Sequence, residues 1–185
     1  MGLFIDRHMD RDMNRDMDRD MDLQSLAHEA AANLIKLKQS VSVAESSTGG
    51  LISASLLAIA GASQYYAGGS VIYTRASRKR FLSLDPLLLK DLAPLSEEMV
   101  IVFAEAAKDS LDASWGLAEL GAAGPTGTPY GHPPGVSVIG VSGPVNLSTR
   151  IETNSADRNQ NMWRFTEAAL QLLTQATAQA LKARD

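Results

Sequence analysis

The sequence contains no cysteine, and this absence excludes several kinds of site at once. Without a thiol, the 185 residues can form no disulfide, no cysteine nucleophile and no cysteine-ligated zinc or iron–sulfur centre. Histidine is also scarce, because the chain has only His8, His28 and His132, which are scattered along it. The sequence therefore predicts no metal site.

An excess of basic residues and long apolar runs are missing as well. The 17 lysines and arginines stand against 21 aspartates and glutamates, a formal net charge of −4, which argues against nucleic acid as a partner. No apolar run approaches the ~18–20 residues of a membrane span. Asp6 and Arg7 follow too short an apolar start for a secretory signal. With 45% hydrophobic residues, we expect one soluble, cytoplasmic domain with a buried core and no membrane partner.

The first 22 residues differ in composition from the rest. Residues 6–22 read DRHMDRDMNRDMDRDMD, where methionine recurs at every fourth position and seven aspartates and four arginines carry −3 of the net charge of −4. On a helix these methionines form a slowly drifting stripe between Asp and Arg pairs. We interpret 1–22 as a low-complexity leader, helical or disordered, that carries no chemistry. A methionine stripe that binds a partner is the alternative.

From residue 23 onward, turn residues separate segments with helical or strand periodicity. Helices are predicted over 23–39, 49–60, 75–82, 96–111 and 158–183, and strands over 40–44, 68–73 and 115–120, with a hairpin formed by 136–144 and 147–153. Ser96 is expected to cap the helix that follows it. A loop rich in glycine and proline spans 121–135. The alternation predicts that 23–185 folds as one α/β domain, in which helices cover a mixed sheet in α+β layers.

The densest polar cluster lies between a predicted strand and a predicted helix, where residues 45–50 read ESSTGG. A strand-to-helix turn presents backbone N–H groups and the positive end of a helix dipole, which suit an anion or an oxyanion. Its hydroxyls offer a nucleophile, although a serine needs a base to activate it. The same residue types also form ordinary capping turns, so this pattern alone leaves both interpretations open.

One family carries these motifs in the same order. The chain reads AESSTGG at 44–50, GSVIYT at 69–74, GAAGP at 121–125 and ADR at 156–158. Over about residues 27–181 it resembles the C-terminal domain of the CinA competence/damage-inducible proteins. The usual signature there is AESCTGG, so Ser47 stands in place of a cysteine. The resemblance implies the fold of that domain, a homodimer or higher homo-oligomer, a small-molecule substrate and no organic cofactor.

The resemblance also implies a reaction. Enzymatic members of the family are nicotinamide-nucleotide amidases, which hydrolyse the carboxamide of nicotinamide mononucleotide with a serine nucleophile, a lysine base and an assisting tyrosine. Carried onto this chain, the nucleophile is Ser46 and the tyrosine is Tyr73. The lysine position holds Arg78, which keeps its proton and cannot be the base. Lys79 replaces it only if the register shifts by one residue, and Glu45 is either an acid–base group or a structural carboxylate.

The remaining candidates would bind the substrate, for which a pyridine nucleotide is the expectation. A glycine turn and a helix start can hold a phosphate. The basic run over 75–80 either binds a phosphate or carboxylate or is a solvated helix face. The loop over 121–135 can close over a pocket. The candidate binding residues are Ser47, Thr48, Gly49, Gly50, Gly121, Ala122, Gly124, Tyr130, His132 and Arg158.

Several positions depart from the family pattern near the expected pocket. Leu120 replaces a serine, Thr126 an acidic residue and Val136 a threonine. Together with Arg78 they indicate a changed pocket, because each polar group left without a partner costs about 1–3 kcal/mol. Three hypotheses stay open. The chain is a C–N (amide) hydrolase of the nicotinamide-nucleotide type, a diverted enzyme that cyclises or isomerises another small metabolite, or a ligand-binding domain without catalysis.

Overall fold

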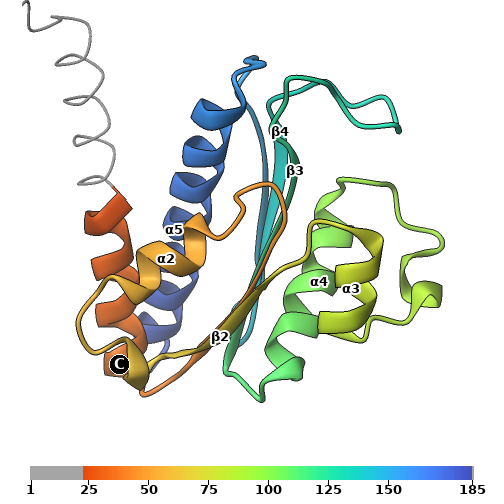
Figure 1. Cartoon of the computed structure of the whole chain (residues 1–185). Helices are drawn as coiled ribbons and strands as arrows, with labels where there is room; N and C mark the ends of the chain where they lie inside the picture. Colours follow the sequence, from red (N-terminus) through yellow and green to blue (C-terminus); the bar gives the residue numbers. More distant parts are fainter. Residues whose placement is uncertain (1–22, 185) are drawn as a thin grey trace, which may run out of the picture.

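The computed structural model describes residues 23–184, and the leader predicted over 1–22 lies outside this part (Figure 1). Its centre is a five-stranded sheet in the order β2-β1-β3-β4-β5. The strands are β1 (Val41–Glu45), β2 (Tyr66–Val71), β3 (Trp115–Ala122), β4 (Val136–Ser142) and β5 (Leu147–Glu152). β1 pairs in parallel with β2 and β3, whereas β3, β4 and β5 pair antiparallel. The sheet is therefore mixed, as predicted.

Helices cover both faces of this sheet. Figure 1 shows the helix over 23–37, α2 (Leu51–Leu57) and α5 (Arg158–Lys182) on one face, with α3 (Arg75–Leu82) and α4 (Glu97–Ser110) on the other. Two short 3-10 turns, Ala62–Gln64 and Pro86–Leu89, lie in the connections. Among the described helices, none is long and apolar enough to cross a membrane.

The strands divide the core in two, because successive side chains point to opposite faces. Val41 and Val43 of β1 belong to the apolar cluster under α5 and the helix over 23–37, whereas Ala44 belongs to the cluster under α4. Gly116 lets α4 approach β3 directly, since a Cβ there would lie 1.8 Å from the carbonyl oxygen of Ala104. The two clusters fix the sheet between its helical layers.

Most predicted elements are present, with shifted ends. The helix predicted over 49–60 is α2, which ends at Leu57. The strand predicted over 68–73 ends at Val71, because Thr74 accepts from the Ser77 amide to cap α3 and the chain leaves the sheet before it. Ser96 caps α4, as predicted, by accepting a backbone N–H of the first turn at 3.1 Å.

The connections on either side of β1 run over opposite faces of the sheet. From β1 the chain passes through α2 to β2, and from β2 it passes through α3 and α4 to β3. The carboxyl end of β1 is therefore a topological switch point, which is where open α/β sheets bind ligands. The turn over 46–50 lies at this point.

Candidate functional site

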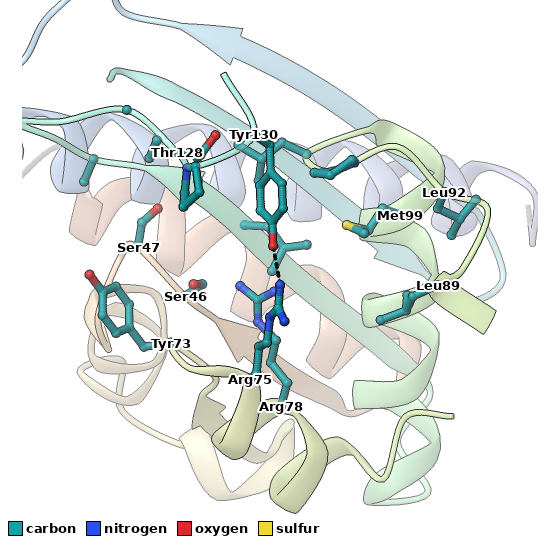
Figure 2. Close-up of a pocket in the computed structure, with 18 of the residues that line it drawn as sticks. Ser46, Ser47, Tyr73, Arg75, Arg78, Leu89, Leu92, Met99, Thr128 and Tyr130 are labelled. Atoms are coloured by element: carbon teal, nitrogen blue, oxygen red, sulfur yellow. Dashed lines mark hydrogen bonds between the residues drawn. The ribbon is translucent and has the colours of Figure 1, made fainter. Parts of the chain in front are cut away.

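A pocket of about 980 Å³ opens at the carboxyl end of β1 (Figure 2). The turn after β1 contributes Ser46 and Ser47, and the start of α3 with the residue before its cap contributes Tyr73, Arg75 and Arg78. Segments within 84–99 and 120–130 and the first residue of α5 complete the wall. In the view of Figure 2, Ser46 lies between Tyr73 on one side and the two arginines on the other.

The charged part of the wall is entirely cationic. It consists of Arg75, Arg78, Lys79, Lys90 and Arg158, and no aspartate or glutamate of the described chain lines the pocket. A cavity lined by one sign of charge concentrates ligands of the opposite sign. Apolar side chains form another part of the wall, namely Leu84, Leu89, Leu92, Leu95 and Met99. The pocket is thus suited to a small anion that also carries an apolar or aromatic group.

The two arginines of α3 that line the pocket are held by protein contacts. Nη2 of Arg75 donates to the Tyr130 hydroxyl at 2.8 Å, which links α3 to the loop (Figure 2). Nε of Arg78 donates to the carbonyl of Ile72 at 3.2 Å, and its guanidinium lies 5.5 Å from the centre of the Phe103 ring. Burial lowers the pKa of Arg78, but an arginine remains protonated in a protein. Arg78 is therefore a fixed cation in the pocket wall.

Arg158 and Tyr73 lie together at another part of the rim. Nη1 of Arg158 donates to the carbonyl of Gly124 at 2.9 Å. Its guanidinium lies 5.9 Å from the centre of the Tyr73 ring, which is within cation–π range. Tyr73 is 58% exposed, so much of its side chain is accessible to a ligand.

Glu45, the last residue of β1, is fully buried and holds the start of α2. Its Oε2 accepts from the amides of Gly50 and Ile52 at 2.9 and 3.1 Å and from the hydroxyl of Thr48 at 2.8 Å. Its Oε1 accepts from the amide and the hydroxyl of Ser53. N–H groups in the first turn of a helix have no partner within the helix, and a negative charge there is favourable. Glu45 therefore occupies N–H groups that the turn could otherwise offer to a ligand.

Glu119 of β3 is a second fully buried carboxylate. Its Oε2 accepts from the amides of Ser46 and Thr48 at 3.1 Å each, and its Oε1 accepts from the hydroxyls of Ser47 and Ser137. The pKa of the Glu119 carboxyl is raised, because the effect of burial exceeds the opposite effect of these hydrogen bonds. No predicted site included this residue. The sequence feature that could have identified Glu119 is its position as the lone acidic residue in the apolar strand WGLAELGA, since carboxylates are almost never buried without partners.

The two serines of the turn differ in their surroundings. Ser46 lines the pocket, and within residues 23–184 its hydroxyl has no hydrogen-bond partner. Ser47 also lines the pocket, but its hydroxyl donates to Glu119. Gly121 lies beside this pair, since a Cβ on it would be 2.5 Å from Ser47 Oγ and 2.8 Å from Glu119 Oε1. Of these two serines, Ser47 is thus paired with a carboxylate, whereas Ser46 has no partner for its hydroxyl among the described residues.

The structure gathers most of the predicted site residues around this one pocket. Those that line it are Ser46, Ser47, Tyr73, Arg78, Lys79, Gly121, Ala122, Gly124, Tyr130 and Arg158. Those that do not line it are Glu45, Thr48, Gly49, Gly50 and His132. The last of these points to its own loop, where its Nδ1 lies 3.0 Å from Thr128 Oγ1.

The positions that depart from the family pattern also divide into those that line the pocket and those that do not. Leu120 and Thr126 line the pocket, whereas Val136 is buried in the core.

The apolar wall from 84–99 was not predicted, because short irregular segments give no periodic signal. Over residues 23–184, no three or more His, Asp and Glu side chains lie close enough together to hold a metal ion.

Comparison with known proteins points to one family. The family model described as the CinA C-terminal domain matches residues 23–177. A CinA-like protein of Prochlorococcus marinus subsp. pastoris is 37% identical over 119 residues, which cover 64% of this chain and 28% of that protein. The chain therefore spans less than a third of the length of this curated relative.

Two crystal structures share the fold. One is a competence-damaged protein (CinA) superfamily protein from Enterobacter cloacae, with a TM-score of 0.77 and 26% identity over 84% of this chain and 92% of that one. The other is a competence/damage inducible protein from Agrobacterium tumefaciens, with a TM-score of 0.76 and 25% identity over 95% of this chain and 99% of that one.

Proposed function

The chain belongs to the CinA C-terminal domain family, and from this membership and the pocket we propose that it hydrolyses a C–N (amide) bond in a small anionic metabolite of the pyridine-nucleotide class. A hydroxyl of the pair Ser46 and Ser47 attacks the amide carbonyl, and Tyr73 assists. The cationic wall binds the phosphate, and the apolar wall over 84–99 receives the flat ring.

One observation carries this proposal: serine hydroxyls and fixed cations line the same pocket, and no carboxylate of residues 23–184 lines it. A cationic wall binds a nucleotide phosphate through charge-assisted hydrogen bonds. Arg158 and Arg75 are restrained by the carbonyl of Gly124 and the hydroxyl of Tyr130, so part of the ordering that a ligand requires is already present. Ser46 and Ser47 lie at a topological switch point, where a bound substrate would reach them.

A second candidate, a diverted enzyme that cyclises or isomerises another small anion, is favoured by the contacts of Arg78. This residue stands where the family has its lysine base, and it is restrained by Ile72 and by the Phe103 ring. A fixed guanidinium stabilises negative charge on a carbonyl or enolate oxygen. Such a role needs no acyl-enzyme.

Ammonia release from nicotinamide mononucleotide tests the first candidate against the second. The matched control is the double variant Ser46→Ala/Ser47→Ala, which keeps every cation of the wall. We expect the wild-type chain to release ammonia and nicotinic acid mononucleotide in equal amounts and the control to release neither. If nicotinamide mononucleotide raises the Tm of both proteins and no ammonia is released, the hydrolase is contradicted.

A further inference from the structure

Ser47 and Glu119 form a hydroxyl–carboxylate pair at the wall of the pocket. The Ser47 hydroxyl donates to Glu119 Oε1, and Ser47 lines the pocket whereas Glu119 lies behind it, 0% exposed. A serine becomes a nucleophile when a positioned base lies within hydrogen-bond reach of its hydroxyl. We infer that Ser47 is the nucleophile of this chain and that Glu119 is its general base, an inference that rests on the proposed hydrolase function.

Ser46, the nucleophile implied by the family resemblance, has no such partner. Its hydroxyl makes no hydrogen bond to any residue between 23 and 184. Arg78 occupies the position of the family base and holds its proton. In the described chain, Lys79 makes no hydrogen bond to either serine, and its side chain is exposed. Among residues 23–184, a hydrogen-bonded base is therefore present for the second serine of the turn and absent for the first.

The backbone of the turn orients the carboxylate for this role. Oε2 of Glu119 accepts the amides of Ser46 and Thr48 at 3.1 Å each, which directs Oε1 toward the hydroxyls of Ser47 and Ser137. Because the strand and the turn hold both ends of the pair, the carboxylate needs no rearrangement to take a proton. Burial also raises the pKa of the Glu119 carboxyl, which strengthens it as a base.

A glycine next to the pair leaves room for a substrate. Gly121 lines the pocket, and a Cβ on it would lie 2.5 Å from Ser47 Oγ and 2.8 Å from Glu119 Oε1. Any larger residue would therefore press on both reacting groups. Ser137, which donates to the same carboxylate oxygen at 2.9 Å, does not line the pocket and so cannot meet a substrate there.

The proposed reaction balances without a further reactant except water. Ser47 Oγ bonds to the amide carbon as its proton passes to Glu119, and water in the pocket protonates the departing nitrogen, so that ammonia leaves and an ester of Ser47 and a hydroxide remain. The hydroxide attacks this ester. The ester bond breaks, the proton returns to Ser47 Oγ, and the product leaves as a carboxylic acid. The serine and the carboxylate end in their starting states.

Two variants separate a catalytic role of the Ser47–Glu119 pair from a structural one, because each removes one of the two serine hydroxyls that donate to Glu119 Oε1. Ser47→Ala removes the hydroxyl that lines the pocket, and Ser137→Ala removes the one that does not. With nicotinamide mononucleotide, we expect kcat to fall by at least about 10³-fold in Ser47→Ala and to keep its order of magnitude in Ser137→Ala. Glu119→Gln should lower kcat by about 10²–10⁴-fold. Equal losses in both serine variants, or a loss confined to Ser46→Ala, would overturn the inference.

A covalent probe distinguishes failure of the pair from failure of the proposed substrate. After reaction with a phosphonofluoridate, peptide mapping should find the label on Ser47, and Glu119→Gln should slow labelling and remove its rise with pH. Label on Ser47 without ammonia release would support the pair and contradict the amidase. Ammonia release with label on Ser46, or with none on either serine, would overturn the pair and leave the amidase standing. No label and no ammonia would overturn both.

The absence of cysteine from the chain allows an independent test of access. Ser47→Cys creates the sole thiol of the protein, and Ser137→Cys is its matched control. We expect iodoacetamide to alkylate the thiol at position 47, with protection by nicotinamide mononucleotide, and to leave the thiol at position 137 unmodified. Equal alkylation of the two thiols would contradict the placement of Ser47 in the pocket.

Discussion

Replacing each buried carboxylate by its amide should have unequal effects on stability, because the hydrogen-bond donors around the two differ. At Glu119, Oε2 accepts two backbone N–H groups, while Oε1 accepts only serine hydroxyls. At Glu45, each oxygen accepts at least one backbone N–H group. A hydroxyl can either donate or accept a hydrogen bond, whereas an N–H group can only donate.

The expected magnitudes follow from this difference. In Glu119→Gln, the amide oxygen accepts from the two N–H groups and the amide NH₂ donates to the two serine hydroxyls, so stability should change by less than about 1 kcal/mol. In Glu45→Gln, the NH₂ faces the N–H group of Ser53, which costs about 1–3 kcal/mol. Loss of the negative charge at the start of α2 adds about 0.3–1 kcal/mol. We therefore expect Glu45→Gln to be about 1–4 kcal/mol less stable than wild type.

Urea unfolding at pH 7, followed by circular dichroism, measures both free energies. With a typical slope of about 2 kcal/mol per molar urea, the midpoint of Glu45→Gln should lie about 0.5–2 M below that of wild type. Glu105→Gln, at an exposed position of α4, is the matched control and should not change the midpoint. If Glu119→Gln loses as much stability as Glu45→Gln, the donor pattern does not govern these sites and the reasoning is refuted.

Three further predictions test local features. Gly121→Ala should lower stability by about 1–3 kcal/mol through the close approach to Ser47 Oγ, and an unchanged Tm would contradict that geometry. Ser96→Ala should cost about 1 kcal/mol in urea unfolding because α4 loses its cap, whereas Ser96→Asp should keep it. Burial raises the pKa of Glu119 in the folded chain. The contribution of this group to the free energy of unfolding is therefore fully present below about pH 4.3, the pKa of an unperturbed glutamate, and is lost as pH rises through the folded pKa. The stability of wild type relative to Glu119→Gln should therefore fall with pH, and a flat or rising difference would exclude a raised pKa.

The sequence predicted the elements of the fold because their signals are local. Apolar periodicity located the helices over 23–37 and Arg158–Lys182 and the five strands, and a single serine placed the start of α4. The end of β2 was misplaced because Val71, Ile72 and Tyr73 continue an apolar run. The capping contact between Thr74 and Ser77 decides where the strand stops, and its competition with the strand is not visible in the apolar pattern.

The carboxylate network could not be predicted because it depends on strand pairing. Glu119 reaches the turn only because Glu45 of β1 is paired in register with it on β3. Similarly, the turn over 46–50 was expected to hold a phosphate, but the amide of Gly50 donates to Glu45 instead. A sequence pattern shows that N–H groups are available at a helix start, and it does not show whether a ligand or a carboxylate of the same chain accepts them.

The most direct test of the proposed hydrolase is the mass of the intact protein during turnover of nicotinamide mononucleotide. Acid-quenched samples should contain a species heavier than the chain by the mass of the substrate less ammonia, on the peptide that carries Ser46 and Ser47. The species should be missing from Ser46→Ala/Ser47→Ala. A serine nucleophile in this turn would be contradicted if the wild-type chain releases ammonia with no such adduct at any quench time and the double variant releases ammonia undiminished.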